Sequence, residues 1–486
     1  MKPMSKPRPV AIGLDLGTGG ARALAMGLDG ELIALTRADF PPEATEINGP
    51  RVEQDPLAWT AAAQTALRAL VDRLPSGCAI VGASADATSG TFVLLDERDR
   101  PLTRGIMYND LRAAGEAAEA DAAVADPLAR YGIRMAASFA LPKLLHCARR
   151  EPALFARCRR IVHQTDWGLA LLCGRYDVTD ISTALKTGAD PVAVGWPAAI
   201  SERLGIARTL LPEIVLPGTI VGAVTAAAAA ATGLSAGTPV VAGCTDGVAG
   251  CLASGAKDAG SLNVTLGTTL IFKAITTQPL IDPTGGVYNH RHPVGGFMPG
   301  AASSTGGDWI PQHFPHADLE QLGGDAARLL PTGRIAYPLV KTGERFPFAC
   351  ATARGFGLDA IGTPAERFAA GLEGVAFLER LGIERLEELG MTVRDTIYAT
   401  GGATAGETWL RIRAAVSRRT FAVPQSAECA VGAAVLAATP HLGGCAAAIA
   451  AMVRIGQRVE PDPQLAAAYD DQYARFRTAL QERGYR

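Results

Sequence analysis

Apolar runs that end in glycine-rich turns organise both halves of the chain. Residues 10–16 form an apolar stretch that carries Asp15 near its end and leads into the turn Gly17-Thr18-Gly19. Residues 261–267 repeat the pattern, and there the turn is Gly267-Thr268. A second apolar run follows each turn. Short apolar runs bounded by turn residues predict buried strands, so each half is expected to begin with two strands joined by a Gly-Thr turn.

The remaining periodicity predicts an α/β fold with a mixed sheet in each half. Strand patterns alternate with amphipathic helices, and the second half replays the order of the first. We predict an N-terminal domain over residues 9–246 and a C-terminal domain over 247–486, with a cleft between them. The expected strands are 10–16, 21–28, 31–36, 79–85, 91–95, 261–267, 269–275, 286–290 and 396–400, and the expected helices are 57–74, 364–389 and 407–417.

The Gly-Thr turns suggest a site for phosphate. Such a turn leaves several backbone N–H groups pointing the same way, which creates an anion site without a cationic side chain. Asp15 adds a carboxylate at the end of an apolar strand, where its charge is costly unless it is compensated. A hydrated Mg²⁺, which takes one or two carboxylates plus substrate phosphates, would compensate it. The alternative is that both segments are ordinary hairpins with glycine at positive φ.

Asp246 follows a second buried strand pattern. Residues 239–243 are apolar and lead through Cys244 and Thr245 to Asp246, at the start of a helix of small residues. As a helix N-cap, this carboxylate would stabilise the fold by roughly 1 kcal/mol. As a catalytic base, it would lie at the carboxyl end of a strand, where open α/β sheets bind ligands. Phosphoryl transfer uses such a carboxylate to accept the proton of the attacking hydroxyl.

Two further loops carry candidate binding residues. The glycine-rich loop that begins with Gly401 and Gly402 lies between a strand and a helix, so a flat ligand could approach its backbone, although a tight turn explains the same pattern. The turn 86–90 is polar between two apolar runs. It could be a simple hairpin, or its hydroxyls, Ser89 among them, could suit a polyol substrate.

Composition narrows the class of protein. The net charge is −2 and Lys and Arg are scattered, which argues against a nucleic-acid-binding surface. Nine cysteines occur without a C-x-x-C pair, as in a reduced intracellular protein. No apolar run approaches the ~20 residues that a membrane span needs. We therefore expect a cytoplasmic protein, a monomer or homodimer, with no nucleic-acid or membrane partner.

From about Val10 to about Ala438 the chain resembles the FGGY family of carbohydrate kinases. The order and spacing of several segments carry the resemblance: Ile12–Thr18, Glu53–Pro56 ahead of Trp59, Pro142–Leu145, Gly243–Gly247, Leu266–Thr268 and Gly401–Gly402. The resemblance implies an actin-like ATPase fold of two ribonuclease-H-like domains, with ATP in the cleft and a sugar as the acceptor. It also implies Asp246 as the base, and Asp15 near Mg²⁺ and the sugar. The implied ATP-binding residues are Gly17, Thr18, Gly19, Gly267, Thr268, Gly401 and Gly402.

The turn 86–90 bears on which sugar is bound. Typical xylulokinases have Gln-Met-His-Gly where this chain has residues 87–90. The string 86–90 is similar to that of the plant and cyanobacterial xylulokinase-like proteins, which act as D-ribulose kinases. The resemblance therefore favours D-ribulose, with Ser89, Asp15 and Asp246 as contacts. Xylulose or another polyol is the alternative acceptor, and a non-catalytic nucleotide-binding switch of the same fold is the alternative of another class.

The loop after Gly402 departs from the family pattern. Many relatives have an Asn or Ser near the end of this loop, where the present chain has Ala403, Thr404, Ala405 and Gly406. Loss of an Asn side chain removes a hydrogen bond to adenosine, which predicts weaker nucleotide binding.

Overall fold

The computed structural model describes residues 7–486, and their contacts divide them into two compact units. Unit 1 runs up to Ala253 and also contains His290–Gly295 and Glu428–Arg454. Unit 2 contains Ser254–Asn289, Gly296–Ala427 and Ile455–Arg486. The predicted division at residues 246/247 is continuous in sequence, whereas these units are not, because the segment 428–454 packs against strands of the first half.

The central sheet of unit 1 has the strand order β12-β13-β6-β1-β2-β3, with β14 also paired to β6. Strands β1, β2 and β3 form the predicted antiparallel meander. Strands β6, β13 and β14 continue the sheet and run parallel to β1. The carboxyl ends of β1, β6 and β14 therefore meet at one edge. The bounds are β1 Arg8–Leu16, β2 Gly20–Gly27, β3 Leu32–Asp39, β6 Cys78–Ala87, β12 Ile220–Ala223, β13 Pro239–Val241 and β14 Cys244–Thr245.

Unit 2 repeats this topology in the order β17-β18-β16-β15-β19-β20-β21. Strands β15, β16 and β18 form an antiparallel meander, and β19 and β20 continue in parallel to β15. The order β18-β16-β15-β19-β20 thus corresponds to β3-β2-β1-β6-β13, which confirms the predicted replay. The bounds are β15 Leu262–Leu266, β16 Leu270–Ala274, β17 Val287–Arg291, β18 Phe297–Ala302, β19 Thr396–Thr400, β20 Thr420–Pro424 and β21 Ile455–Val459.

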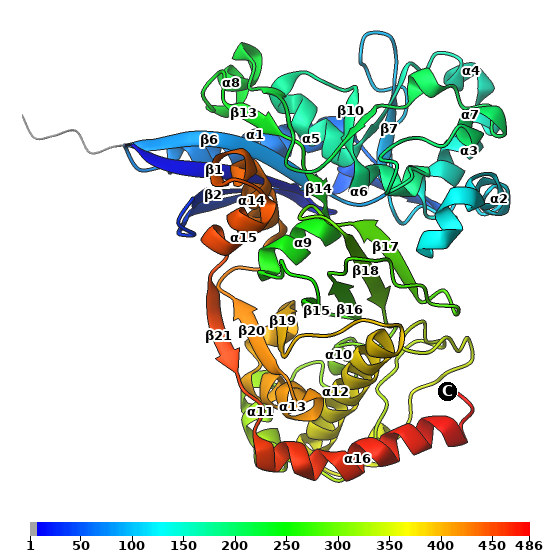
Figure 1. Ribbon diagram of the computed structural model, residues 1–486, viewed down its shortest axis with the longest axis vertical. Helices are drawn as coiled ribbons and strands as arrows, with labels where there is room; N and C mark the ends of the chain where they lie inside the picture. The colour runs from blue at the N-terminus through cyan, green and yellow to red at the C-terminus, as the bar shows by residue number, and fades with distance from the viewer. Residues whose placement is uncertain (1–6) are drawn as a thin grey trace, which may run out of the picture. The chain divides into compact units, whose positions relative to one another are not determined.

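Helices cover both faces of the unit 1 sheet, and glycine determines how closely one of them approaches. Helix α14 (Cys429–Leu442) lies on β1 and β6 (Figure 1). A Cβ atom at Gly13 would lie 1.9 Å from the carbonyl oxygen of Ala430. Helices α1 (Pro56–Asp72) and α5 (Gln164–Cys173) pack against the same sheet, and Gly168 of α5 faces the Leu14 and Leu16 side chains. Since side chains alternate along a strand, α5 and α14 lie on opposite faces.

The polar turn 86–90 is not a hairpin. Strand β6 belongs to the central sheet, whereas β7 (Phe92–Leu95) belongs to a second sheet of order β4-β5-β8-β7-β9. The turn therefore carries the chain from one sheet to another. The remaining elements of unit 1 are β4 Thr45–Asn48, β5 Arg51–Gln54, β8 Gly105–Ile106, β9 Arg160–His163, β10 Val178–Asp180, β11 Glu213–Val215, α2 Ala117–Leu128, α3 Ala140–Arg150, α4 Pro152–Phe155, α6 Ile181–Ala184, α7 Ala199–Glu202, α8 Ala226–Thr232 and α15 Cys445–Met452.

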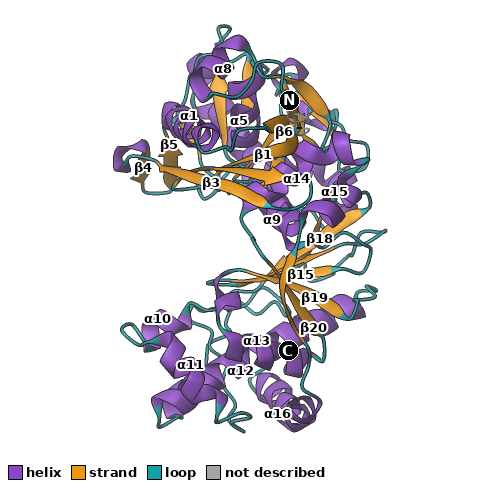
Figure 2. Ribbon diagram, turned by 90° about the vertical axis from the view of Figure 1, so that its left-hand side faces the viewer, coloured by secondary structure: helices purple, strands orange, loops and turns teal. Residues whose placement is uncertain are grey.

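Unit 2 is held together by the long helix α12 (Pro364–Glu388), beside which α13 (Glu407–Ser417) and α16 (Pro463–Glu482) lie (Figure 2). Arg413 of α13 forms a fully buried ion pair with Glu379 of α12, with Nε 2.7 Å from Oε2. The C-terminal helix α16 buries Tyr469 and Phe476 in the same core. The shorter helices are α9 Asp246–Ser254, which begins in unit 1, α10 Trp309–His313 and α11 Leu319–Ala327.

Within residues 7–486 no single helix meets the length and hydropathy needed to cross a membrane. The bent pair α14 and α15 meets them only when the two helices are taken together.

Candidate functional site

Three aspartates gather where β1, β6 and β14 end. Asp15 of β1 pairs in register with Asp86 of β6, and Asp86 pairs with Cys244 of β14. Asp246 comes two residues later, as the first residue of α9. Asp15 is 4% exposed and Asp86 is fully buried, whereas Asp246 is half-buried. All three belong to unit 1, so the site that they form depends on that unit alone.

Arg22 supplies the positive charge that Asp15 requires. The Arg22 Nη1 atom donates to Asp15 Oδ2 at 2.9 Å from the neighbouring strand, and Glu428 Oε2 lies 3.7 Å from Arg22 Nε. Burial raises the pKa of Asp15, Arg22 opposes this effect, and the negative charges of Asp246 and Glu428 add to it. A metal ion was the expected source of this compensation, and Arg22 was not among the expected site residues. The signal in the sequence is the spacing: Arg22 stands seven residues after Asp15, on the other side of the turn.

Asp246 lies at the junction of strand and helix. Its Oδ1 atom accepts a hydrogen bond from the Gly247 amide at 2.6 Å, and its carbonyl oxygen accepts one from Cys429 Sγ at 3.5 Å. The residue as a whole is partly exposed. The position fits both interpretations of this residue, a helix-starting carboxylate and a catalytic base.

Two lysines hold the turn that contains Ser89. Lys143 of α3 donates from Nζ to the carbonyl oxygens of Gly90 at 2.9 Å and Met107 at 2.7 Å. Lys186 donates to the preceding carbonyl, that of Ser89, at 3.0 Å. Lys143 is fully buried, and this burial lowers its pKa to about 7. Two amines from different segments thus fix successive backbone carbonyls of the turn.

The first Gly-Thr turn connects β1 and β2 as predicted. The Gly17 amide donates to the Gly20 carbonyl at 3.0 Å, which closes the turn, while Thr18 and Gly19 are exposed. Gln54 donates from Nε2 to the Thr18 carbonyl at 2.8 Å. Hydrogen bonds therefore fix the backbone of the turn, while Thr18 and Gly19 at its tip face solvent.

The second turn and the late glycine loop lie side by side in unit 2. Gly267 connects β15 and β16, and its carbonyl accepts a hydrogen bond from the Gly307 amide at 2.8 Å. Gly401 has φ +91°, and a Cβ atom there would lie 2.5 Å from the carbonyl oxygen of Leu266. Only glycine fits this close approach at a left-handed backbone. Thr268 and Gly402 are exposed beside these glycines, so the four predicted ATP-binding residues of this half share one edge of the sheet.

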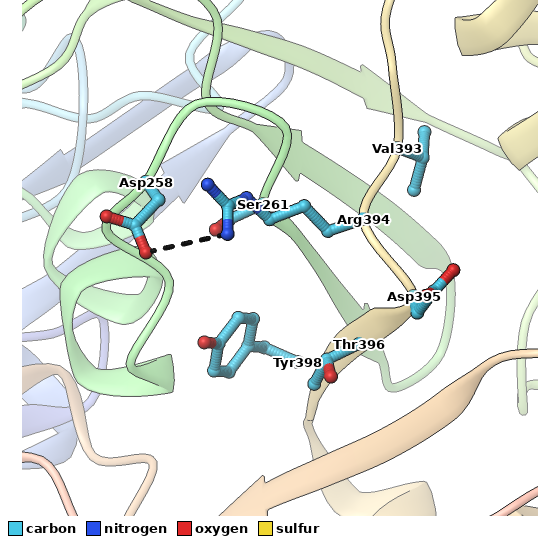
Figure 3. A pocket seen from close by; sticks show the side chains of 7 residues that line it. All are labelled: Asp258, Ser261, Val393, Arg394, Asp395, Thr396 and Tyr398. Atoms are coloured by element: carbon cyan, nitrogen blue, oxygen red, sulfur yellow. Dashed lines mark ion pairs between the residues drawn. The ribbon is translucent and has the colours of Figure 1, made fainter.

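A polar pocket of about 500 Å³ lies at the opposite end of the same strands (Figure 3). Of the residues that line it, Ser261 immediately precedes β15 and Thr396 is the first residue of β19. Gly267 and Gly401 follow the carboxyl ends of these two strands. Arg394 reaches toward Asp258, with Nη1 4.0 Å from Oδ2. None of the predicted site residues lines this pocket.

In the part of the chain from residue 7 onward, no cluster of three or more His, Cys, Asp or Glu side chains is arranged to hold a metal ion. A metal that enters with a phosphate ligand does not require such a cluster, because Mg²⁺ is usually bound by one or two carboxylates, waters and phosphate oxygens.

Comparison with known families agrees with this arrangement of strand ends and turns. Residues 10–253 match the N-terminal domain of the FGGY family of carbohydrate kinases, and residues 262–440 match its C-terminal domain. The chain belongs to the FGGY family of carbohydrate kinases. The duplicated topology is accordingly the actin-like ATPase fold, and the protein is a sugar kinase.

Individual relatives align with nearly the full length of this FGGY kinase. Xylulose kinase of Escherichia coli (strain K12) is 28% identical, with 97% of this chain and 98% of the relative covered. Autoinducer-2 kinase of Salmonella choleraesuis (strain SC-B67) is 27% identical and covers 96% and 93%. The structure of xylulose kinase from Rhodospirillum rubrum superposes with a TM-score of 0.84 at 28% identity, over 97% of this chain and 98% of that one.

Proposed function

We propose that this FGGY kinase transfers the terminal phosphoryl group of ATP to a terminal hydroxyl of a pentulose, and that the pentulose is D-ribulose. The observation that carries the proposal is the meeting of Asp15, Asp246 and the Ser89 turn at one edge of the unit 1 sheet. The turn 86–90 differs in sequence from that of typical xylulokinases, which favours D-ribulose over D-xylulose.

Asp246 acts as the base in this proposal. It takes the proton of the sugar hydroxyl, the freed oxygen forms a bond to the γ-phosphorus, and the bond from that phosphorus to the β,γ-bridging oxygen breaks to release ADP. A base needs a carboxylate that a substrate can reach, and Asp246 is half-buried at the start of α9. Asp15 and Ser89 hold the sugar beside it.

The turns bind the nucleotide through their amides. Gly17, Thr18 and Gly19 in unit 1, and Gly267 and Thr268 in unit 2, contact the phosphates, while Gly401 and Gly402 lie against the nucleoside. A Mg²⁺ ion bound with ATP would supply positive charge that offsets the charge of the phosphates. Asp15 is the carboxylate that would face it, which fits a buried residue with one oxygen bonded to Arg22 and the buried carboxyl of Asp86 alongside it in the sheet.

The decisive experiment measures sugar-dependent ADP release with a panel of ketoses and polyols. We expect D-ribulose to give the highest kcat/KM, with D-xylulose and glycerol lower. Xylulose is the alternative acceptor, and a higher kcat/KM for it would overturn the assignment of the sugar. Absence of sugar-dependent ADP release for every member of the panel would contradict the proposed pentulose kinase activity.

The Asp246→Asn variant tests the base. General-base catalysis contributes roughly 10²- to 10⁴-fold, so kcat should fall by that factor. Asp318→Asn is the matched control, because Asp318 caps α11 by accepting from the Glu320 and Gln321 amides and lies outside the site. Activity of Asp246→Asn within a few-fold of the wild type would show that Asp246 only begins its helix.

A further inference from the structure

Strand β14, which leads into Asp246, is held by side chains as well as by its strand partner. It is two residues long and pairs with β6 through Cys244 and Thr245. The amide of Thr245, the residue before Asp246, donates to Ser182 Oγ at 3.2 Å. The carbonyl oxygen of Cys244 accepts from Thr165 Oγ1 at 3.4 Å. Since so short a strand forms few backbone hydrogen bonds, these side-chain bonds help to determine where Asp246 begins its helix.

Ser182 accepts from Thr245 because its own proton is directed elsewhere. The Ser182 hydroxyl donates to Asp180 Oδ1 at 2.5 Å, and a hydroxyl group has only one proton to donate. Its lone pairs are left to accept the Thr245 amide. Asp180 Oδ1 also accepts from the amides of Ser182 at 2.8 Å and Thr183 at 3.2 Å, which caps α6. The Asp180 carboxyl group therefore fixes both the start of this helix and the Ser182 hydroxyl.

This chain of hydrogen bonds is buried along its whole length. Asp180, Ser182 and Thr245 are each at most 2% exposed. In the protein interior a hydrogen bond is electrostatically stronger than in water, and a buried amide without an acceptor is costly. The bonds from Asp180 through Ser182 to the Thr245 amide thus end one residue before the carboxylate that is proposed as the base.

The same segment also bonds to the turn that contains Ser89. Lys186, four residues after Ser182, donates from Nζ to the Ser89 carbonyl at 3.0 Å. Residues 180–187 therefore connect the strand that leads to the base with the turn that is proposed to hold the sugar, and all of these residues belong to unit 1. Catalysis depends on such placement, because a displacement of about 1 Å can lower a rate about 100-fold.

We propose that Ser182 and Asp180 are positioning residues for Asp246, an inference that rests on the proposed function. Ser182 acts through the Thr245 amide, and Asp180 acts by orienting the Ser182 hydroxyl. Without the Ser182 acceptor, the buried Thr245 amide loses its partner and the adjoining backbone changes its position. The Asp246 carboxylate then no longer meets the sugar hydroxyl in the geometry that proton transfer requires.

The test is a double-mutant cycle between Ser182→Ala and Asp246→Asn. The acceptor is the sugar with the highest kcat/KM in the panel, and transfer of labelled phosphate from ATP is followed so that slow residual rates are detected. The kcat and the KM values for sugar and ATP are measured for the wild type, both single variants and the double variant. Thr232→Val is the matched control. Buried Thr232, at the end of α8, likewise donates to a carbonyl, that of Ala228 at 2.7 Å, and accepts from an amide, that of Leu234 at 3.3 Å.

We expect Ser182→Ala to lower kcat roughly 10- to 100-fold, with both KM values within about three-fold of the wild type. In the Asp246→Asn background the same substitution should change kcat by less than about two-fold, because the group that Ser182 positions is no longer a base. Thr232→Val should leave kcat within about two-fold of the wild type. Asp180→Asn keeps a good helix cap but weakens the bond to the Ser182 hydroxyl, so it should lower kcat roughly 3- to 10-fold. Its control is Asp318→Asn, since Asp318 caps α11 through the same pair of amide bonds.

Each contrary result has a distinct meaning. A kcat of Ser182→Ala within two-fold of the wild type overturns this inference, as does an equal loss of kcat in both backgrounds, which would show a structural role; both results leave the proposed function standing. If Ser182→Ala does not fold, Asp180→Asn decides by the same cycle. If Asp246→Asn transfers no measurable phosphate, a rise in both KM values of Ser182→Ala alongside the fall in kcat overturns the inference. Activity of Asp246→Asn within a few-fold of the wild type contradicts the base assignment in the proposed function itself.

Discussion

Replacing Lys143 by Met should remove a specific pH dependence of stability. Lys143 is fully buried, and its pKa is lowered to about 7 because burial penalises the ammonium form. A neutral amine has two N–H groups, and the structure provides two acceptors, the carbonyls of Gly90 and Met107. The folded state therefore satisfies the neutral amine, whereas the unfolded state holds an ordinary lysine that stays protonated until about pH 10.

The sign of the effect follows from proton counting. Below pH 7 both states bind the proton, so stability does not change with pH through this group. Above pH 7 the unfolded state binds more protons than the folded state, so the free energy of unfolding rises with pH. With a pKa near 7 in the folded state, the gain between pH 7 and pH 9 is about 2 kcal/mol, since one pKa unit corresponds to about 1.4 kcal/mol.

Neighbouring groups do not obscure this difference. The pKa of Asp110 is lowered, because its bonds to Arg112 and to backbone amides outweigh the effect of burial, so it stays charged across this range. Its bonded partner Arg112 has a raised pKa and also stays charged. The Cys147 thiol stays protonated because burial raises its pKa to about 12.

The assay is urea unfolding at pH 7, 8 and 9 for the wild type and Lys143→Met. We expect the wild type to gain about 2 kcal/mol relative to the variant over this range. At pH 7 the variant's free energy of unfolding should fall by roughly 1–3 kcal/mol for each of the two carbonyls left without a donor. This loss is reduced because the variant no longer buries a charged ammonium group. Parallel stability curves for the two proteins between pH 7 and 9 would refute the reasoning.

Three further substitutions probe the site. Arg22→Met leaves the buried Asp15 carboxylate without its partly exposed counter-ion and should cost roughly 1–2 kcal/mol in urea unfolding, together with a fall in kcat/KM; an unchanged stability would contradict the pairing. Gly401→Ala places a Cβ atom 2.5 Å from the Leu266 carbonyl oxygen at a residue with φ +91°. The free energy of unfolding should therefore fall by about 1–3 kcal/mol, and the KM for ATP should rise. The KM for the sugar is the internal control. Ser89→Ala removes a buried hydroxyl that has no partner in residues 7–486, so thermal stability should stay nearly unchanged. The KM for the sugar should rise roughly 5- to 10-fold. An equal rise in the KM for ATP would argue against a sugar contact.

Local patterns along the chain predicted most of the elements well. The helix expected at 364–389 occupies Pro364–Glu388, and the strand expected at 396–400 has the same bounds in the structure. Both are long or strongly periodic and end at clear turn residues, which is where periodicity is most informative. The two Gly-Thr turns were also found this way, since each interrupts a pair of apolar runs.

Pairing between distant strands could not be read in the same way. The apolar run 91–95 follows β6 directly and was weighed as a hairpin partner, yet β7 pairs in another sheet. Local sequence describes the face and period of a strand but does not name its partner. For the same reason Asp86 received no role, because its place between Asp15 and β14 exists only once the parallel register is known.

Helix α14 shows how a late segment contributes to a site in the first half of the chain. It packs on β1 and β6 because Gly13 and Gly82 carry no side chains where its carbonyl oxygens of Ala430 and Ala437 approach, and a Cβ atom at Gly82 would lie 2.5 Å from the latter. Its first residue, Cys429, donates to the Asp246 carbonyl. The amino end of a helix carries a partial positive charge, which favours nearby carboxylates. The aspartates of β1, β6 and α9 therefore depend on a helix more than 180 residues beyond Asp246, and the glycines that admit it are as necessary to the site as the carboxylates themselves.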